Sequence, residues 1–346
     1  MATAASDATT SSSSSTAAVM RPNPKQLVDF FARSLTSFQS SPDVFRVLCT
    51  LPHVVGGREP GPRRASSQVV RRLVVLDSSF NPPTRAHGEM ARSALRWASS
   101  TTTAAATPLL GGGKDADDDA GGGGGTTTTS VRLMLLLSVN NADKAPKPAS
   151  FPVRLGMMDA FGHGLLRSLG DEGIRPEIDV AVTKMPYFHD KARVIGESGV
   201  YRSSSSALGQ GGGYEPEQVF LAGFDTVIRI FNPKYYGGGG GGMKAALGPF
   251  FERARLRVTM RTDDEWGGEE EQRAYVRGLG EGVLDEVGGD AAWAGRVDLV
   301  QGGGTGNGVS SSKVREMVRR GEREALGEMV DGEVLEWIEG MGLYRE

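Results

Sequence analysis

The feature that most constrains the fold is one stretch, residues 73–87, which changes its sequence pattern twice. It opens with the apolar run Leu73 to Leu76, which is typical of a buried parallel strand. The segment Asn81 to Pro83 then ends the strand, because proline lacks the amide hydrogen that a β-ladder needs. From Gly88 to Ala98, apolar residues recur at helical spacing. The stretch therefore predicts a strand, a polar loop and a helix, and open α/β sheets bind ligands where such strands end.

The predicted loop is rich in groups that form hydrogen bonds. It carries Ser78, Ser79, Asn81 and Thr84, and His87 follows on the first helical turn. The first turn of a helix has unpaired backbone N–H groups and the positive end of the helix dipole, and both attract anions. The loop is therefore predicted to bind phosphate.

Further apolar runs alternate with helical patterns along the rest of the chain. They are predicted strands, and they cover residues 131–137, 178–182, 218–222, 256–260 and 297–300. Strands that alternate with helices indicate parallel pairing through helical crossovers. We therefore expect an α/β protein with a Rossmann-like open parallel sheet and helices on both faces.

Both ends of the folded chain and one later segment also show helical periodicity. Apolar spacing between Asn23 and Leu51 predicts two short helices on the edge of the domain. Residues 269–287 predict one helix with a charged face, and residues 333–341 predict a terminal helix that docks through Val334, Trp337 and Ile338. We assign no function to these helices.

Glycine is unusually frequent, with 49 residues, and much of it lies in uninterrupted runs. Such runs bury no apolar surface and behave as flexible linkers. We therefore expect flexible, low-complexity insertions at about 99–130, 202–214, 237–242 and 302–308. Residues 1–20 are mostly Ala, Ser and Thr without a basic residue, which predicts a disordered tail rather than a transit peptide. The remaining residues, 21–346, are predicted to form a single domain.

Composition also excludes several classes of function. The net charge of −3 gives no electrostatic signature for nucleic acid, and we expect no nucleic-acid partner. The sequence contains no apolar stretch of roughly 18 residues, so we expect no membrane partner. Cys49 is the single cysteine, and no Cys/His cluster has metal-ligand spacing, so we predict no protein metal ligands. A lone cysteine fits a reducing compartment, and we expect a cytoplasmic or nuclear location.

A second distinctive phrase lies near the other end of the chain. Val309-Ser310-Ser311-Ser312-Lys313-Val314-Arg315 opens a predicted helix whose Val314 faces inward. Its hydroxyl and cationic groups again lie at a helix N-terminus, where anions bind. The chain therefore offers two phosphate-binding helix starts.

These two phrases resemble the signature motifs of a known enzyme superfamily. The segment from Ser79 to His87, read as SFNPPTxxH, resembles the first signature of the (H/T)xxH nucleotidyltransferase superfamily, and it is most similar to the nicotinamide mononucleotide adenylyltransferases. The segment from Val309 to Arg315 resembles the ISSTxxR phrase of that family, with Val in place of Ile and Ser in place of Thr. One departure is Ser78, which stands where the family usually has glycine.

The resemblance implies roles for particular residues. His87, Thr84 and Arg315 would be catalytic, contacting the phosphates of ATP from the two helix starts. The implied substrate-binding residues are Ser78, Ser79, Phe80, Asn81, Lys144, Arg154, Phe188, Gly223, Asp225, Ser311, Ser312 and Lys313. Among them, Gly223 and Asp225 resemble the G-x-D step of the family, and Phe188 would belong to an aromatic wall for the nicotinamide ring.

The reaction implied by the resemblance joins the 5′-phosphate of a mononucleotide to the α-phosphorus of ATP and releases pyrophosphate. The attacking phosphate is mostly ionised near pH 7, since its second pKa is about 6, so no strong general base is required. The catalyst instead positions two anionic groups and stabilises charge on oxygen. Mg²⁺ would be held mainly by substrate phosphates, because this ion tends to keep its waters.

Three alternatives remain open from the sequence. A related transferase would use another phosphorylated acceptor. A class I aminoacyl-tRNA synthetase would need an added RNA-binding domain, which neither charge nor length indicates. A nucleotide-binding protein weakened through Ser78 would bind ATP without turnover. ATP and a mononucleotide are the expected partners, and the sequence leaves the oligomeric state open.

Overall fold

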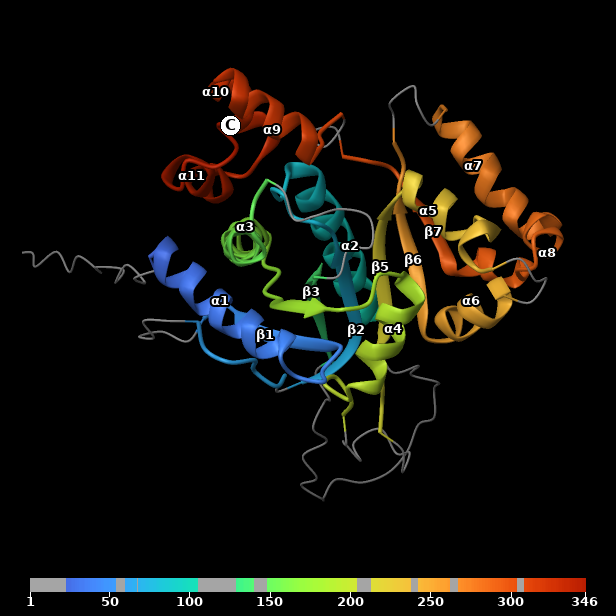
Figure 1. The fold of residues 1–346 in the computed structure, drawn as a ribbon. Helices are drawn as coiled ribbons and strands as arrows, with labels where there is room; N and C mark the ends of the chain where they lie inside the picture. Colours follow the sequence, from blue (N-terminus) through green and yellow to red (C-terminus); the bar gives the residue numbers. More distant parts are fainter. Residues whose placement is uncertain are drawn as a thin grey trace, which may run out of the picture.

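The computed structural model places the elements of one extended α/β sheet and its covering helices (Figure 1). The described residues are 23–53, 60–66, 68–104, 129–139, 148–203, 213–237, 242–261, 267–303 and 308–346. Lys144 and the predicted tail at residues 1–20 lie outside them, as does most of each predicted insertion.

Within the described residues, seven strands form one sheet in the order β1-β4-β3-β2-β5-β6-β7. The strands are β1 (Phe45–Leu51), β2 (Val69–Asp77), β3 (Thr129–Ser138), β4 (Glu177–Thr183), β5 (Glu217–Gly223), β6 (Ala254–Thr259) and β7 (Val297–Val300). All pairs are parallel except β1 with β4. At the centre, Leu76 of β2 pairs with Leu135 of β3 and Leu221 of β5. The predicted α/β sheet is confirmed, and each predicted strand lies inside an observed one except 256–260, which extends one residue past the end of β6.

The first strand corrects a prediction. Residues 23–51 contain one helix, α1 (Pro24–Gln39), followed by the antiparallel edge strand β1, rather than two helices. Asn23 caps α1 by accepting from the backbone N–H of Lys25. In β1, nearly every residue is buried because the strand is covered on both faces, so its apolar run does not alternate.

Helices cover both faces of the sheet (Figure 1). One face carries α1, α2 (Arg85–Ala104), α3 (Phe151–Asp171) and α11 (Gly332–Gly340), with α9 (Ser311–Arg320) and α10 (Arg323–Met329) near its upper end. The other face carries α4 (Phe188–Glu197), α5 (Phe224–Ile230), α6 (Gly242–Arg253), α7 (Glu269–Gly278) and α8 (Leu284–Glu286). Each face has its own apolar core, as parallel sheets require.

The C-terminal helix docks as predicted. Val334, Trp337 and Ile338 of α11 are buried against α3. Gly156 of α3 makes this close approach possible, since a Cβ at that position would lie 2.2 Å from the Trp337 ring. The predicted docking stripe is therefore confirmed, and it places the chain end beside the start of α3.

The predicted helix over 269–287 is interrupted. It begins as α7, becomes a π-helical stretch at Leu279–Val283 and ends as the short α8. Gly282 has φ of 110°, which no continuous α-helix contains. Two short 3₁₀ turns, Pro233–Tyr235 and Ala291–Arg296, complete the regular structure in the described chain.

Helices and a strand extend into the edges of the predicted insertions. Helix α2 continues to Ala104 and β3 begins at Thr129, so the predicted insertion loses residues at both ends to regular structure. Gly242 belongs to α6 rather than to a linker, and Ser203 pairs with Tyr214 across the 202–214 segment. The flexibility predicted for the remaining residues lies outside the described part of the chain.

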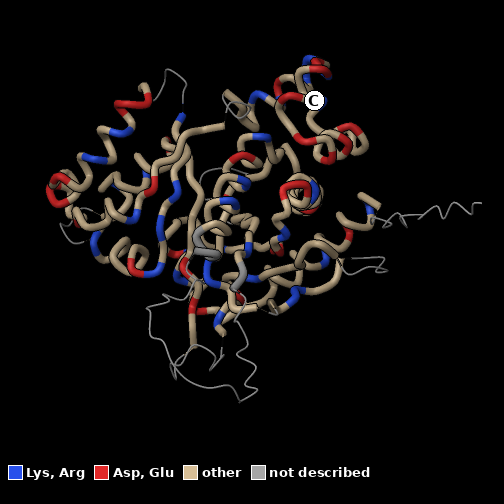
Figure 2. Tube along the Cα trace, turned by 180° about the vertical axis from the view of Figure 1, so that it is seen from behind, with Lys and Arg blue, Asp and Glu red and all other residues tan. Residues whose placement is uncertain are grey.

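Charged residues of both signs are interspersed along the described trace (Figure 2). The sequence holds 39 Lys and Arg against 42 Asp and Glu. None of the described helices is long and apolar enough to cross a membrane. The expectations of no nucleic-acid partner and no membrane partner, and of a cytoplasmic or nuclear location, stay predictions.

Candidate active site

A large cleft opens at the carboxyl ends of β2, β5 and β6, where an open parallel sheet is expected to bind ligands. Its volume is about 920 Å³. The first turn of α2, the residues that begin α9 and the starts of α4 and α5 all line it. Both predicted phosphate-binding phrases therefore reach the same cleft.

The histidine of the first phrase sits in a hydrogen-bonded loop. The backbone N–H of Thr84 donates to His87 Nδ1 over 3.1 Å, so this nitrogen is an acceptor. The other ring nitrogen, Nε2, then carries the proton and donates to Ser78 Oγ at 2.8 Å. Burial lowers the pKa of His87 to about 4. His87 is therefore a neutral donor near pH 7 rather than a cation.

The two phrases contact each other although they are far apart in the sequence. The residues of the first contact, Pro82 and Ser311, are 229 positions apart. Ser311 Oγ donates to the carbonyl of Pro82 at 2.8 Å. Arg315 Nη1 donates to the carbonyl of Asn81 at 2.7 Å. Ser310 caps α9 by accepting from the backbone N–H of Lys313. These contacts hold the N-terminus of α9 beside the loop that precedes α2.

Past the end of β5, Gly223 and Asp225 stand on the cleft wall. Asp225 Oδ1 forms an ion pair with Arg261 Nε at 3.2 Å. The other carboxylate oxygen of Asp225 lies 3.8 Å from Arg229 Nη2. A Cβ on residue 223 would lie 2.7 Å from Asp225 Oδ1, so glycine is needed for this carboxylate to stand where it does. The G-x-D step therefore fixes one acidic group at the mouth of the cleft.

Aromatic side chains also line the cleft, and we call Tyr187, Phe188, His189 and Tyr236 the aromatic wall. Tyr187 and His189 stack with ring centroids 5.6 Å apart and planes at 4°, and Tyr236 lies 5.9 Å from His189. Burial lowers the pKa of His189 and raises the pKa of Tyr236, so both side chains are neutral near pH 7. Phe188 also lines the cleft. These rings offer aromatic surface to a planar ring, with Tyr236 tilted at 50° to His189.

A buried ion pair lies behind the cleft. Lys191 Nζ contacts Asp77 Oδ2 at 2.5 Å, and both side chains are less than a tenth exposed. The ammonium also stands 5.6 Å from the centre of the Phe188 ring. Asp77 ends β2 and lines the cleft, so this pair joins the central strand to α4.

The structure brings together eight of the predicted site residues on the cleft lining. They are Ser78, Thr84, His87, Phe188, Gly223, Asp225, Ser311 and Lys313. The other described ones, which do not line it, are Ser79, Phe80, Asn81, Arg154, Ser312 and Arg315. Ser79 is exposed to solvent, while Ser312 accepts from Arg315 at 3.0 Å.

Three of these residues are instead packed inside the protein, in contrast to the prediction that they contact substrate. Phe80 has φ of 46° and turns its fully buried ring beneath His87 and against Phe161. Asn81 Oδ1 accepts from the Tyr344 hydroxyl at 2.9 Å, which holds the loop to the chain end. Arg154 donates from Nε to the carbonyl of Ala149 and is almost fully buried. These side chains shape the loop from behind.

The sequence prediction missed several residues that line the cleft. They are Asp77, Glu89, His189, Tyr236 and Arg261. Asp77 and Arg261 directly follow the apolar runs of β2 and β6, so polar residues at strand ends were the available signal. Gly302, Gly303 and Gly308, at the two ends of the predicted 302–308 insertion, also line the cleft, and a Cβ on Gly303 would lie 2.7 Å from Glu89 Oε2. The flexibility predicted for this segment stays a prediction.

The low pKa of His87 predicts a pH dependence of stability. In the unfolded chain the imidazole has its ordinary pKa of 6.5, so between pH 6.5 and 4 the unfolded state binds more protons. The contribution of His87 is therefore complete above pH 6.5 and is lost as the pH falls towards 4, by up to about 3 kcal/mol. Urea unfolding at stepped pH should show a flatter profile for His87→Gln than for wild type. Parallel profiles would contradict the buried, neutral imidazole.

Comparisons with known proteins give one informative relative. No protein-family model matches the sequence. The chain is 30% identical over 274 residues to a protein of Schizosaccharomyces pombe named "Putative nicotinamide mononucleotide adenylyltransferase". The alignment covers 79% of this chain and 86% of that relative. A likeness of this extent places both chains in one family.

Solved structures show weaker likeness. A Plasmodium falciparum nicotinic acid mononucleotide adenylyltransferase complexed with NaAD aligns with a TM-score of 0.41 and 11% identity, covering 79% of this chain and 97% of that one. Thermotoga maritima TmcAL bound with alpha-thio ATP gives a TM-score of 0.35 and 13% identity, with coverages of 78% and 56%. Scores this low add nothing to the family assignment.

Proposed function

This chain belongs to the family of nicotinamide mononucleotide adenylyltransferase-like nucleotidyltransferases, and we propose that it transfers the adenylyl group of ATP to nicotinamide mononucleotide, giving NAD and pyrophosphate. One observation carries the proposal. The N-termini of α2 and α9 are tied together by Ser311 and Arg315, and the aromatic wall lines the same cleft. The helix N-termini suit a triphosphate, and the aromatic side chains suit a pyridine ring.

The triphosphate would lie between α2 and α9. Thr84, His87, Ser311 and Lys313 line this part of the cleft and offer hydrogen-bond donors. The single N–H of the neutral imidazole is held by Ser78 Oγ, so His87 would donate to a phosphate oxygen by turning that N–H away from Ser78, and it needs no prior protonation. Lys313 brings a positive charge to the same end. The arrangement stabilises negative charge that develops on phosphate oxygens as pyrophosphate leaves.

The acceptor would lie against the aromatic wall with its phosphate turned towards the α-phosphorus. Its phosphate supplies the attacking oxygen, which is already ionised near pH 7, so the protein need not remove a proton. Positioning two anions in line is the main requirement. The residues around the cleft are placed for binding and orientation rather than for covalent catalysis.

Magnesium is expected to be held by the substrates. The described carboxylates on the cleft wall already have cationic partners: Asp77 pairs with Lys191, Glu89 with Arg92 and Asp225 with Arg261. This leaves phosphate oxygens and water as the main ligands, which suits the preference of Mg²⁺ for keeping waters. The ion would neutralise charge between the phosphates when bound.

The neutrality of the wall favours nicotinamide over nicotinate as the acceptor base. Tyr187, His189 and Tyr236 present no fixed positive charge to the ring, because His189 is neutral near pH 7. The nearby guanidinium of Arg261 is already paired with Asp225. A carboxylate on the pyridine ring would therefore lose hydration without gaining a dedicated cation. The uncharged amide of nicotinamide loses less hydration free energy in the same position.

A panel of acceptors tests the proposal. Purified protein with ATP and magnesium should release pyrophosphate with nicotinamide mononucleotide, and more slowly with nicotinate mononucleotide. Faster turnover with nicotinate would reverse the base preference. Release with another phosphorylated acceptor alone would favour the related-transferase alternative, and ATP binding without any release would favour the non-enzymatic one.

Ser78 provides a narrower prediction. Its hydroxyl accepts from His87 Nε2 and lines the cleft, so its own proton is placed to donate to a phosphate oxygen. Ser78→Ala should raise the KM for ATP roughly 2- to 10-fold, the effect of one neutral hydrogen bond of about 0.5–1.5 kcal/mol. Ser100→Ala, which removes an exposed hydroxyl in the C-terminal part of α2, is the matched control. A lower KM in Ser78→Ala would mean that serine obstructs the site where the family usually has glycine.

A further inference from the structure

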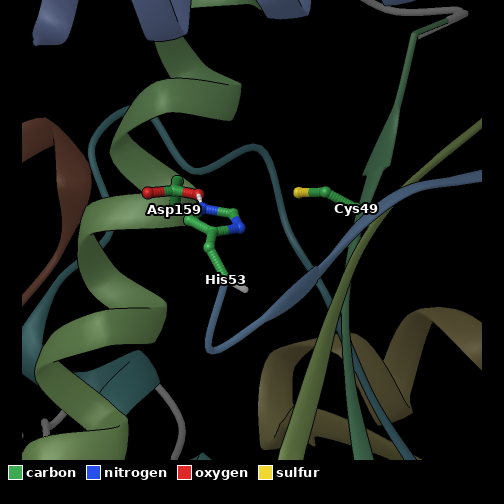
Figure 3. Close-up of side chains that lie close together, drawn as sticks. All are labelled: Cys49, His53 and Asp159. Carbon is green, nitrogen blue, oxygen red and sulfur yellow. Dashed lines mark hydrogen bonds and ion pairs between the residues drawn. The ribbon is translucent and has the colours of Figure 1, made fainter. Parts of the chain in front are cut away.

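A cluster of metal-ligating side chains lies away from the cleft (Figure 3). Cys49 is on β1, His53 follows the end of that strand, and Asp159 is on α3. One ligand atom from each lies within 4.8 Å of the others. Figure 3 shows the Cys49 sulfur pointing towards the imidazole of His53 and the carboxylate of Asp159. Three side chains from two elements and a loop therefore converge on one point.

Only one of the two ring nitrogens of His53 has a hydrogen-bond partner among the described residues. His53 Nε2 lies 2.6 Å from Asp159 Oδ2, which accounts for one ring nitrogen. The other nitrogen, Nδ1, is buried and has no hydrogen-bond partner among the described residues. A buried polar atom without a partner is costly, so native structures leave few of them. The protein atoms alone therefore do not satisfy this ring, and an ion shared with Asp159 would be bound through Nε2, in place of the hydrogen bond to Oδ2.

From this geometry we propose that Cys49, His53 and Asp159 bind a structural zinc ion. A set of sulfur, imidazole nitrogen and carboxylate oxygen donors suits Zn²⁺, whereas Mg²⁺ and Ca²⁺ prefer oxygen alone. The charges also balance, because a thiolate and a carboxylate together compensate a divalent cation. A neutral His53 completes the set without adding charge.

His163 is placed to supply a fourth ligand. It lies one helical turn after Asp159 on the same face of α3, with its Nε2 3.7 Å from Asp159 Oδ1. Its ring centre is 5.3 Å from that of His53. Structural zinc sites are usually four-coordinate and tetrahedral. The side chains of His53 and His163 are 11% and 19% exposed, so the ion has an entrance from solvent on the histidine side.

A nucleophilic triad is the competing interpretation of Cys49, His53 and Asp159. It would require substrate to reach the sulfur, but Cys49 is fully buried. Metal binding is therefore the chemistry that the site favours.

The ion would fasten the N-terminal part of the sheet. β1 is the antiparallel edge strand, and α3 covers the face beside it. A metal that joins the end of β1 to the middle of α3 would hold these elements together, and its binding free energy would add to folding. The site would thus act on stability, independently of turnover in the cleft.

Metal content and cobalt spectroscopy test the proposal on the full chain. Wild-type protein should retain one zinc per chain through gel filtration, and Co²⁺ should give a thiolate charge-transfer band with intense visible bands typical of tetrahedral sites. Cys49→Ala and His53→Ala should each weaken metal affinity at least about 100-fold, since even outer-shell partners typically contribute 10- to 100-fold. Zinc should raise the unfolding temperature of wild type and leave that of both variants unchanged.

His189→Ala is the matched control. His189 is also about one-fifth exposed and lies 3.6 Å from a carboxylate, that of Asp190, but no cysteine completes its surroundings in the described residues. This variant should keep its zinc. If Cys49→Ala does not fold, wild-type cobalt spectra together with His53→Ala decide the matter. A cobalt protein without the thiolate band, or unchanged metal content in His53→Ala, would overturn the proposal.

Discussion

Replacing His87 by alanine is expected to lower kcat on the order of 10²–10³-fold, the loss typical of a preorganised donor to developing negative charge. The imidazole is held by Ser78 and Thr84 and lines the cleft beside the start of α2. Steady-state pyrophosphate release measures the effect, and urea unfolding at pH 8 verifies that the variant is folded. Full turnover in the variant would remove His87 from the site.

Arg315→Ala extends the same prediction to the other end of the chain. From the sequence we expected Arg315 to contact the phosphates of ATP. The structure instead gives its guanidinium two contacts, to the carbonyl of Asn81 and to Ser312 Oγ, so its loss should also loosen the loop. Turnover should fall by a similar factor, with a lower unfolding temperature. The double variant with His87→Ala should lose less than the product of the single losses, because both changes disturb one transition state.

Replacing Lys191 by methionine is expected to destabilise the folded protein by about 3–5 kcal/mol. Methionine keeps the alkyl chain but leaves the carboxylate of Asp77 buried without its partner at the end of β2. Urea unfolding near neutral pH measures the loss.

The double variant Lys191→Met with Asp77→Asn provides the control. It removes both charges and should recover most of the lost stability, because an uncompensated buried charge accounts for most of the cost. If Lys191→Met alone were as stable as wild type, the ion pair would contribute little to stability. Our description of a buried Lys191–Asp77 pair behind the cleft would then be wrong.

The sheet was largely predictable from sequence because parallel strands buried on both faces read as continuous apolar runs. The runs at 73–76, 131–137 and 218–222 all lie within observed central strands. The prediction failed at β1, where Phe45, Val47 and Leu48 fit a helix as well as a strand. Short apolar runs do not distinguish the two by periodicity alone. Pairing with β4 decided the outcome, and that contact is remote in sequence.

The candidate site was predictable where its position follows from topology. Ser78, Thr84 and His87 lie next to a strand end and a helix start, so the local sequence places them at the cleft. The orientation of neighbouring side chains does not follow in the same way. Asn81 turns inwards because Tyr344, 263 positions later, donates to its side chain. No local pattern contains such a partner.

The zinc proposal shows the same limit more sharply. His53 and Asp159 are 106 positions apart, and a search for closely spaced Cys and His ligands does not connect them. Only the packing of α3 beside the end of β1 brings them together. Our sequence analysis accordingly predicted no protein metal ligands. The spacing of Cys49, on β1, to His53, in the following loop, and the spacing of Asp159 to His163 within α3 were the local signals available.

The central claim is that the cleft transfers the adenylyl group of ATP. Following the α-phosphorus of labelled ATP, with nicotinamide mononucleotide and magnesium present, tests it most directly. The account predicts that label from the α-position appears in the dinucleotide NAD, while label from the γ-position appears in pyrophosphate. Label that remains in ATP, or α-label released as AMP without a dinucleotide, would contradict adenylyl transfer by this protein.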